Sequence, residues 1–178
     1  MERVGVIVGR NGRVRKRIEE LTNTKIEVDS EGTVTIRSPE DSDDPVLAWR
    51  ARDIIRAMAR GFSPKNALML IDEDARLVVV SLREIVGPSP NQLKRVAGRI
   101  IGERGRTRRV IERTTETKIS VYGKTVSLIG FDPGLQYAHK AVDMLIGGAP
   151  HNAVYAMLER ARRQMTRLEA ELWEDTDL

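Results

Sequence analysis

The 178-residue chain contains no cysteine and only two histidines, His139 and His151. The lack of cysteine excludes disulfide bonds, thiolate metal sites and cysteine nucleophiles, and two histidines are too few for a typical zinc site. The Walker sequence G-x-x-x-x-G-K-[ST] is absent, and the glycines at 5, 9 and 12 lack the following βαβ unit of a dinucleotide site. We therefore predict a protein that is not an enzyme and that uses no cofactor or metal.

Aromatic residues make up only 4% of the chain, and no stretch approaches the roughly 18 apolar residues of a membrane span. The scarcity of aromatics disfavours nucleic-acid binders that stack bases on Phe, Tyr or Trp. The start, Met1-Glu2-Arg3-Val4, lacks the apolar segment of a secretory signal. Together with the missing cysteine, these features predict a cytoplasmic protein that does not enter a membrane.

One segment of the chain occurs twice. Residues 5–28 align without a gap with residues 98–121, and 13 of the 24 positions are identical. Such a repeat predicts two domains of similar fold, and about 80–90 residues are enough for each to form its own core. The identical pairs include Gly5/Gly98, Ile7/Ile100, Gly9/Gly102, Gly12/Gly105, Arg13/Arg106, Arg15/Arg108, Ile18/Ile111, and Thr24-Lys25-Ile26 against Thr117-Lys118-Ile119.

Charge is unevenly placed, although the net charge is only +4. Acidic residues gather at 40–44, 72–74 and 169–177, whereas basic residues crowd both repeats. Segregation of this kind is typical of a protein with a polyanionic ligand. A solvated helix face would also be basic, but two clusters in register beside the same G-x-x-G turn favour the ligand. The clusters are Arg10, Arg13, Arg15, Lys16 and Arg17, and Arg99, Arg104, Arg106, Arg108 and Arg109.

Both repeats predict the same order of elements. The first has a helical segment ending at Val8, a helix at 13–21, strands at 24–28 and 33–36, and a helix at 45–60. The second has a strand at 77–82, helices at 91–101 and 106–114, strands at 117–122 and 124–129, and a helix at 134–146. The first copy begins inside the motif, so we expect its first strand to be missing from this chain. A final helix should run from 151 to about 173. We interpret it as packing across both domains, with dimer formation as the alternative.

The G-x-x-G turn before each basic helix is suited to holding a phosphate. Its glycines let the backbone turn tightly and approach another backbone closely. The helix that follows offers free N–H groups and a partial positive charge, and arginines add charge-assisted hydrogen bonds. Aliphatic residues beside the turn are expected to line a narrow groove that admits single-stranded bases and excludes a duplex. They are Ile7, Val8, Ile26 and Val28, and Ile100, Ile101, Ile119 and Val121.

The order helix, G-x-x-G turn, helix, strand, strand, helix, with I-[VI]-G-x-x-G at the turn, resembles the K-homology (KH) domain of type I. The resemblance covers nearly the whole chain and implies an α+β fold. We expect two tandem type I KH domains, each a three-stranded sheet with helices on one face, plus a long C-terminal helix. The expected bounds are residues 1–70 and 75–150 for the domains, and 151–178 for the C-terminal helix and acidic tail.

The resemblance implies that RNA is bound at the two turns, at the basic helix after each turn and at one strand isoleucine per copy. In the first copy these residues are Gly9, Arg10, Asn11, Gly12, Arg13, Lys16, Arg17 and Ile26. In the second copy they are Gly102, Glu103, Arg104, Gly105, Arg106, Arg109 and Ile119.

Two features depart from the KH pattern. Glu103 places an acid in a loop that is usually basic or glycine-rich. Arg15 and Arg108 stand where many KH helices carry an aliphatic residue, so the apolar floor of the groove would have to come from neighbouring positions. Those positions are Val14, Ile18, Val110 and Ile111.

The paired copies, and the sequence Gly-Phe-Ser-Pro-Lys-Asn-Ala at 61–67, resemble archaeal KH proteins related to eukaryotic small-subunit rRNA processing factors. The resemblance implies binding of single-stranded RNA, small-subunit rRNA in ribosome maturation, with ribosome-maturation or translation-initiation proteins as partners. The alternative is a KH scaffold in which one domain binds RNA and the other contacts proteins, such as an rRNA endonuclease or an initiation-factor subunit.

If the two copies bind one strand together, changing Arg10 and Asn11 to Asp should cost far more affinity on a long RNA than on one of about four nucleotides. Linked sites raise affinity roughly 10²–10⁴-fold when both engage. The fold should survive because Gly9 and Gly12 remain. Fluorescence anisotropy with the two RNA lengths measures the losses, and equal losses would show that the copies act independently.

Overall fold

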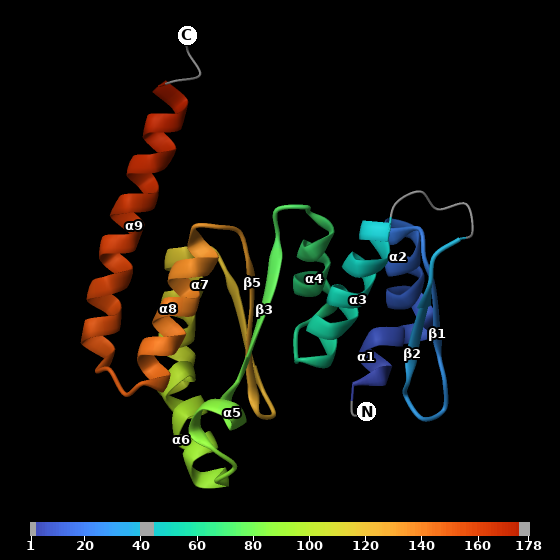
Figure 1. Cartoon of the computed structure of the whole chain (residues 1–178), viewed down its shortest axis with the longest axis horizontal. Coiled ribbons are helices and arrows are strands. Elements are labelled where there is room, and N and C mark those ends of the chain that lie inside the picture. Colours follow the sequence, from blue (N-terminus) through green and yellow to red (C-terminus); the bar gives the residue numbers. More distant parts are fainter. Residues whose placement is uncertain (1–2, 40–44, 175–178) are drawn as a thin grey trace. The chain divides into compact units, whose positions relative to one another are not determined.

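The computed structural model describes residues 3–39 and 45–174 of the chain. It has the predicted mixture of helices and sheets, and it divides into two compact units, residues 1–77 and 78–178 (Figure 1). The domain bounds at residues 70, 75 and 150 remain predictions.

The second repeat builds a three-stranded sheet with helices on one face (Figure 1). The strand order is β3 (Arg76–Ser81), β5 (Thr125–Gly130), β4 (Lys118–Tyr122), so β4 lies at an edge. Strands β4 and β5 are antiparallel, with Ile119 opposite Leu128. The helices are α5 (Leu82–Val86), α6 (Pro90–Ile101), α7 (Arg106–Thr115) and α8 (Gly134–Ile146), and the short turn η3 (Glu103–Gly105) joins α6 to α7.

Apolar periodicity explains how these helices meet the sheet. Ile100 on α6, Ile111 on α7 and Leu145 on α8 are fully buried in one core with Leu128 of β5. Every residue of β5 is buried, as expected for the central strand of a sheet. The core therefore fixes the end of α6 and the start of α7, between which the G-x-x-G turn lies.

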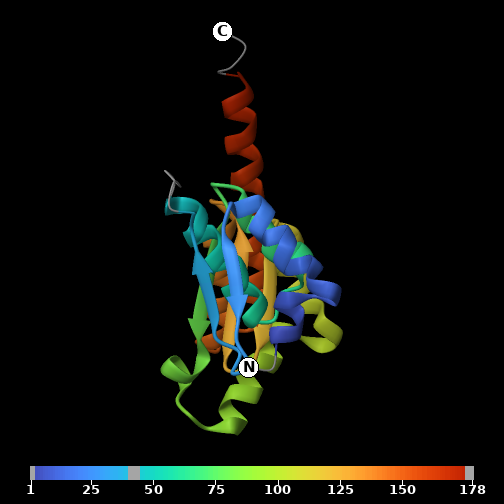
Figure 2. The same ribbon diagram turned by 90° about the vertical axis from the view of Figure 1, so that its right-hand side faces the viewer.

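The first repeat builds a smaller sheet. Its elements are α1 (Val4–Val8), η1 (Arg10–Gly12), α2 (Arg13–Thr22), β1 (Lys25–Val28), β2 (Val34–Arg37), α3 (Pro45–Ala59), α4 (Pro64–Ala67) and η2 (Leu68–Ile71). Strands β1 and β2 form an antiparallel pair with Ile26 opposite Ile36 (Figure 2). In the described residues this sheet has two strands, and the three-stranded form expected of a complete copy is seen in the second repeat.

A pair of buried threonines fixes the step from helix to strand in both repeats. Thr22 Oγ1 donates to the Ile18 carbonyl at 2.7 Å and lies 2.7 Å from Thr24 Oγ1. In the second repeat Thr115 Oγ1 donates to the Ile111 carbonyl at 2.8 Å and lies 2.8 Å from Thr117 Oγ1. These bonds satisfy hydroxyls that would be costly to bury alone. They hold the start of the strand against the end of the basic helix.

The C-terminal helix α9 (His151–Glu174) packs on α7 and α8 of its own unit, and Figure 1 shows it extending beyond them. Its buried hydrophobic residues in the described part of the chain are Val154, Met157, Leu158 and Ala161. Packing across both domains stays a prediction. Within the described ranges, no helix combines the length and the apolar character needed to cross a membrane.

Arginine side chains donate hydrogen bonds to backbone carbonyls at the carboxyl ends of α3 and α8. Arg99 donates from Nε to the Leu145 carbonyl at 3.1 Å and from Nη2 to the Ala149 carbonyl. Arg3 donates in the same way to Met58 at 2.7 Å and Phe62 at 3.0 Å. Carbonyls at a helix end have no partner within the helix. Arg99 belongs by sequence to the basic cluster of the second repeat, but its guanidinium donates hydrogen bonds to the end of α8.

We predict that Arg99→Ala lowers the free energy of unfolding by about 1.5–3 kcal/mol, because it removes hydrogen bonds from a charged donor to part-buried carbonyls. Arg95→Ala is the matched control, since Arg95 is an exposed arginine on the same helix. Urea denaturation followed by circular dichroism measures both. Equal losses would contradict the assigned role of Arg99.

Candidate nucleic-acid interface

The two G-x-x-G turns have the same backbone conformation. Gly9 and Gly102 have φ/ψ of 71°/172° and 72°/173°, and the second glycines, Gly12 and Gly105, lie in the left-handed region at 73°/11° and 77°/16°. The third residue of each turn is also left-handed, with φ of 56° at Asn11 and 49° at Arg104. The repeat has therefore preserved geometry where the residues between the glycines differ.

Different physical reasons require the two glycines of each turn. A Cβ at Gly9 would clash with the Val14 side chain, and one at Gly102 would lie 2.7 Å from the Thr107 amide nitrogen. Space is freer at Gly12, where the positive φ is the constraint. The turn thus brings its own backbone against the first turn of the following helix.

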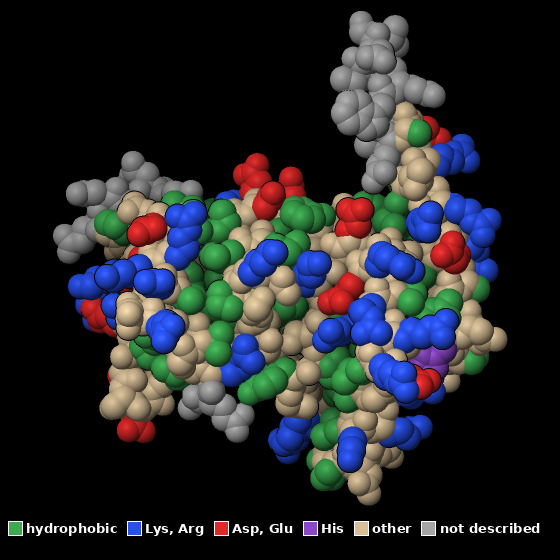
Figure 3. Space-filling model, turned by 180° about the vertical axis from the view of Figure 1, so that it is seen from behind, with side chains coloured by type: hydrophobic (Ala, Val, Ile, Leu, Met, Phe, Trp, Pro, Cys, Tyr) green, Lys and Arg blue, Asp and Glu red, His purple; other side chains and the backbone are tan. Residues whose placement is uncertain are grey.

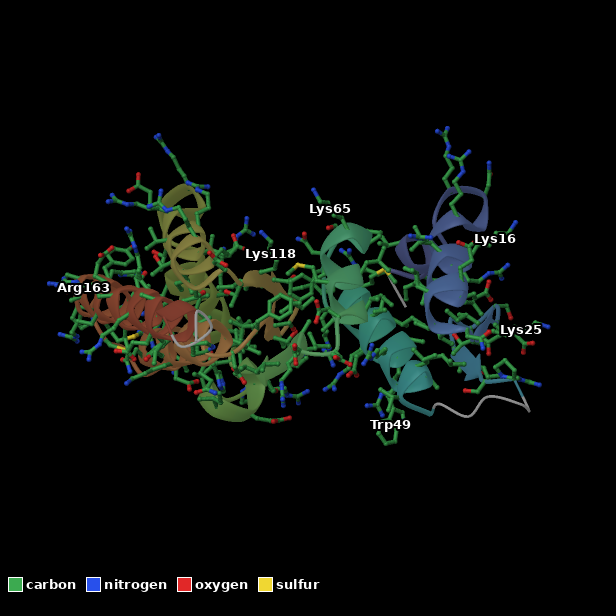
Figure 4. All side chains as sticks on the ribbon, turned by 90° about the horizontal axis from the view of Figure 1, so that it is seen from above. Lys16, Lys25, Trp49, Lys65, Lys118 and Arg163 are labelled. Atoms are coloured by element: carbon green, nitrogen blue, oxygen red, sulfur yellow. The ribbon has the colours of Figure 1, made fainter. Side chains whose placement is uncertain are left out.

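The turns expose positive charge and free backbone donors. Neither α2 nor α7 receives a hydrogen bond from a capping side chain at its N-terminus, and the N–H of the first residue of each helix donates to a carbonyl of the turn. The N–H groups of the next residues, which have no partner within a helix, are therefore open to an anion. The predicted cations around them are solvent-exposed, and Figure 4 shows Lys16 projecting from the first unit. These exposed residues are Arg10, Arg13, Lys16 and Arg17 in the first copy, and Arg104, Arg106 and Arg109 in the second.

A basic groove of about 650 Å³ runs beside α7 in the second unit. Val110 gives it an apolar patch, and Glu112 is its one acid. The sequence-based site omitted Arg113 and Lys118, which also line it; Lys118 is labelled in Figure 4. Helical spacing could have found Arg113, which lies one turn beyond Arg109 and two beyond Arg106. The lining residues are Arg106, Arg109, Val110, Glu112, Arg113 and Lys118.

The corresponding face of α2 in the first unit has a different charge pattern. Arg17 stands in the place of Val110, and Glu20 in the place of Arg113. Arg17 and Glu20 form an exposed ion pair of 3.5 Å. The first surface is therefore more polar and less uniformly positive than the second.

The two predicted strand isoleucines do not line an open groove. Ile26 is 1% exposed and Ile119 is 4% exposed, because their side chains point into the core. Strand residues alternate between faces, and the pattern of β1 shows Lys25 and Glu27 outward on either side of Ile26. Ile7, Ile18, Ile100 and Ile111 are likewise buried. The partly exposed aliphatic residues are Val8, Val14 and Val28 in the first copy, and Ile101, Val110 and Val121 in the second.

The two unusual arginines are explained by acids one turn further along their helices. Arg15 Nε lies 4.0 Å from Glu19 Oε2, and Arg108 Nε lies 3.7 Å from Glu112 Oε2. The positions where many KH helices carry an aliphatic residue therefore hold an ion pair in both copies.

Glu103 is exposed and makes no ion pair with any described residue. It borders a second hollow of about 540 Å³ with Arg95, Arg106, His151 and Tyr155. Arg99 also borders this hollow, but it donates to the helix carbonyls. Figure 3 shows basic side chains gathered over the second unit around a histidine. In the described residues, no group of three or more His, Asp or Glu could hold a metal.

Known proteins share this arrangement. Residues 76–163 match the family model described as "Eukaryotic type KH-domain (KH-domain type I)", and residues 1–45 match the KH domain model. A KH domain-containing protein of Methanocaldococcus jannaschii is 43% identical over 97% of this chain and 75% of its own length. The chain belongs to the KH-domain family. Within it, the chain is homologous to the PNO1/Dim2 rRNA-processing factors.

Two further relatives support this position within the KH family. The RNA-binding protein pno-1 of Caenorhabditis elegans is 34% identical over 76% of this chain, which spans half of that protein's length. The crystal structure of the a/eIF2alpha–aDim2p–rRNA complex from Pyrococcus horikoshii contains a chain that is 43% identical, with a TM-score of 0.85. That match covers 92% of this chain and 90% of the other. KH domains are binding modules, and none of these relatives indicates an enzymatic activity.

We predict that Glu103→Lys tightens RNA binding several-fold at low salt, because it replaces a repulsion from phosphate with an attraction. The gain should shrink as salt rises, and thermal stability should not change, since Glu103 has no ion-pair partner among the described residues. Glu116→Lys is the control. It makes the same charge change about 15 Å away at the other end of α7. Titrations at two salt concentrations measure both variants, and no tightening at either would mean that the second turn holds no phosphate.

Proposed function

We propose that this protein binds single-stranded RNA through both G-x-x-G turns, and that it binds small-subunit ribosomal RNA during ribosome maturation. The observation that carries the proposal is the repeated turn. Its left-handed backbone presents uncapped helix N–H groups between exposed cations in both copies. This combination suits the phosphate backbone of a nucleic-acid strand, because it offers hydrogen-bond donors and positive charge at two separate turns.

The groove beside α7 supports a single strand as the ligand. Its walls are basic, Val110 provides an apolar contact, and the edge of β4 lies at its side. Unstacked bases can enter a space between a helix and a strand and present their edges to it, whereas paired bases in a duplex cannot. Phosphates would then lie at the turn and the bases in the groove.

We further propose that the chain is a tandem of two type I KH domains, followed by α9. The shared turn, the shared threonine pair and the matching order of elements support the assignment for the first unit, although its described sheet has two strands. Because the surfaces of α2 and α7 differ in charge, the two domains should prefer different sequences.

The identity of the RNA and the protein partners is inferred from the relatives. Those include a pre-rRNA-processing protein of Schizosaccharomyces pombe and the structure of a complex with rRNA and a/eIF2alpha. Ribosome-maturation or translation-initiation proteins are therefore the partners that we propose, and the cytoplasm is the compartment. In the scaffold alternative only one domain binds RNA, and loop variants made separately in the two turns distinguish it.

Binding should favour single-stranded over double-stranded RNA of the same sequence. If about six phosphates are neutralised, the logarithm of the binding constant should fall with the logarithm of salt concentration at a slope of about −4. Fluorescence anisotropy with small-subunit rRNA fragments, single-stranded and annealed to their complements, measures both quantities. Equal affinity for the perfect duplex would overturn the proposal.

A further inference from the structure

A carboxylate occupies the open edge of β4 inside the basic groove. Glu112 lines the groove, and its Oε1 accepts a hydrogen bond from the Ile119 backbone N–H at 2.9 Å. That N–H therefore points away from β5 and toward the groove, even though the Ile119 side chain is buried. The contribution of Ile119 to the surface is its backbone.

The same arrangement occurs in the first unit. Glu19 Oε1 accepts a hydrogen bond from the Ile26 N–H at 2.7 Å. Glu19 and Glu112 are equivalent in the repeat, and so are Ile26 and Ile119. The side chains are similarly accessible, at 23% for Glu19 and 21% for Glu112. The two surfaces differ in charge, but they share this carboxylate at the strand edge.

The carboxylate changes what the strand edge offers to a base. A free edge would present both N–H donors and C=O acceptors. With the Ile119 N–H occupied, the edge at this point presents carboxylate oxygens, which only accept hydrogen bonds when ionised. Within the described residues, Glu112 Oε2 forms an ion pair with Arg108 Nε at 3.7 Å, and a carboxylate oxygen with this one partner has acceptor capacity left.

Bases differ in how they meet such an acceptor. Cytosine and adenine carry exocyclic amino groups that donate hydrogen bonds, and guanine also has one. Uracil carries a carbonyl oxygen where cytosine carries the amino group, and that oxygen would face the carboxylate without a proton between them. A desolvated contact of this kind is costly.

We propose that Glu112 and Glu19 determine base specificity, each selecting a base with an exocyclic amino group and rejecting uracil. The inference rests on the proposed RNA binding. A purely structural role would need only an acceptor for the strand N–H, and glutamine would serve equally well. Selection needs the acceptor-only character of the acid, and the two roles therefore separate in an amide variant.

The test uses Glu112→Gln, Glu19→Gln and the double variant in the full chain. The amide oxygen can keep the bond to the strand N–H, while the amide NH₂ can donate to the uracil oxygen. Anisotropy titrations with oligomers of about six cytidines, adenosines or uridines measure the preference over uridine. Wild type should prefer cytidine and adenosine, and each single variant should reduce that preference about three- to tenfold. The double variant should reduce it most.

Two controls separate selection from structure. Glu159→Gln makes the same chemical change at an exposed position of α9 and should leave the preference unchanged. Glu112→Ala removes the hydrogen bond to the Ile119 N–H and should lower the melting temperature, whereas the glutamine variants should melt like wild type. An unchanged preference in a double variant that still binds RNA would overturn the inference and leave the proposed function intact, as would a wild type without preference against uridine. A wild type that binds no single strand would instead overturn the proposed function.

Discussion

Both candidate surfaces depend on a left-handed stretch of backbone between two helices. In each turn the residues at the third and fourth positions have positive φ, and the first glycine also has positive φ. Arg104 adopts this conformation without the freedom of glycine, at a cost on the order of 1–3 kcal/mol. In the second unit, the helices before and after the turn are anchored in one hydrophobic core, which restrains the turn between them. The uncapped helix start, the exposed cations and the adjoining groove all take their positions from it.

The two repeats have preserved their internal hydrogen bonds more strictly than their surfaces. The hydrogen bond between the paired threonines has nearly the same length in both units, and so does the hydrogen bond from the strand N–H to the glutamate carboxylate. Surface positions of the same helix have diverged, as Arg17 against Val110 shows. Burial accounts for the difference, because an unpaired polar group inside the fold is costly, whereas exposed side chains can change with little effect on stability. At this position the two copies differ where a ligand could contact the helix.

The repeat and its periodicity were enough to predict the order of elements, the turns and the exposed cations, because these follow from local sequence. They were not enough for contacts between distant segments. Ile26 and Ile119 were placed in the groove because an aliphatic residue beside a G-x-x-G helix suits a base, but their side chains complete the core. By sequence Arg99 is one of a cluster of surface cations. In the fold it donates to the carbonyl of Leu145 in α8, which lies 46 residues further along the chain. Lys118 lines the groove because the fold places β4 beside α7, and the local sequence does not reveal that contact.

The arginines that bind the ends of α3 and α8 show how far the two copies have diverged. Arg3 and Arg99 serve the same purpose but are not equivalent in the alignment, where Arg3 corresponds to Val96 and Arg99 to Val6. A guanidinium binds the end of the third helix in both copies, but it comes from different positions of the repeat. A copy of residues 5–28 inserted at 98–121 would bring valine to position 99 and leave the end of α8 without its donor. The repeats share an origin, but they are no longer exchangeable parts.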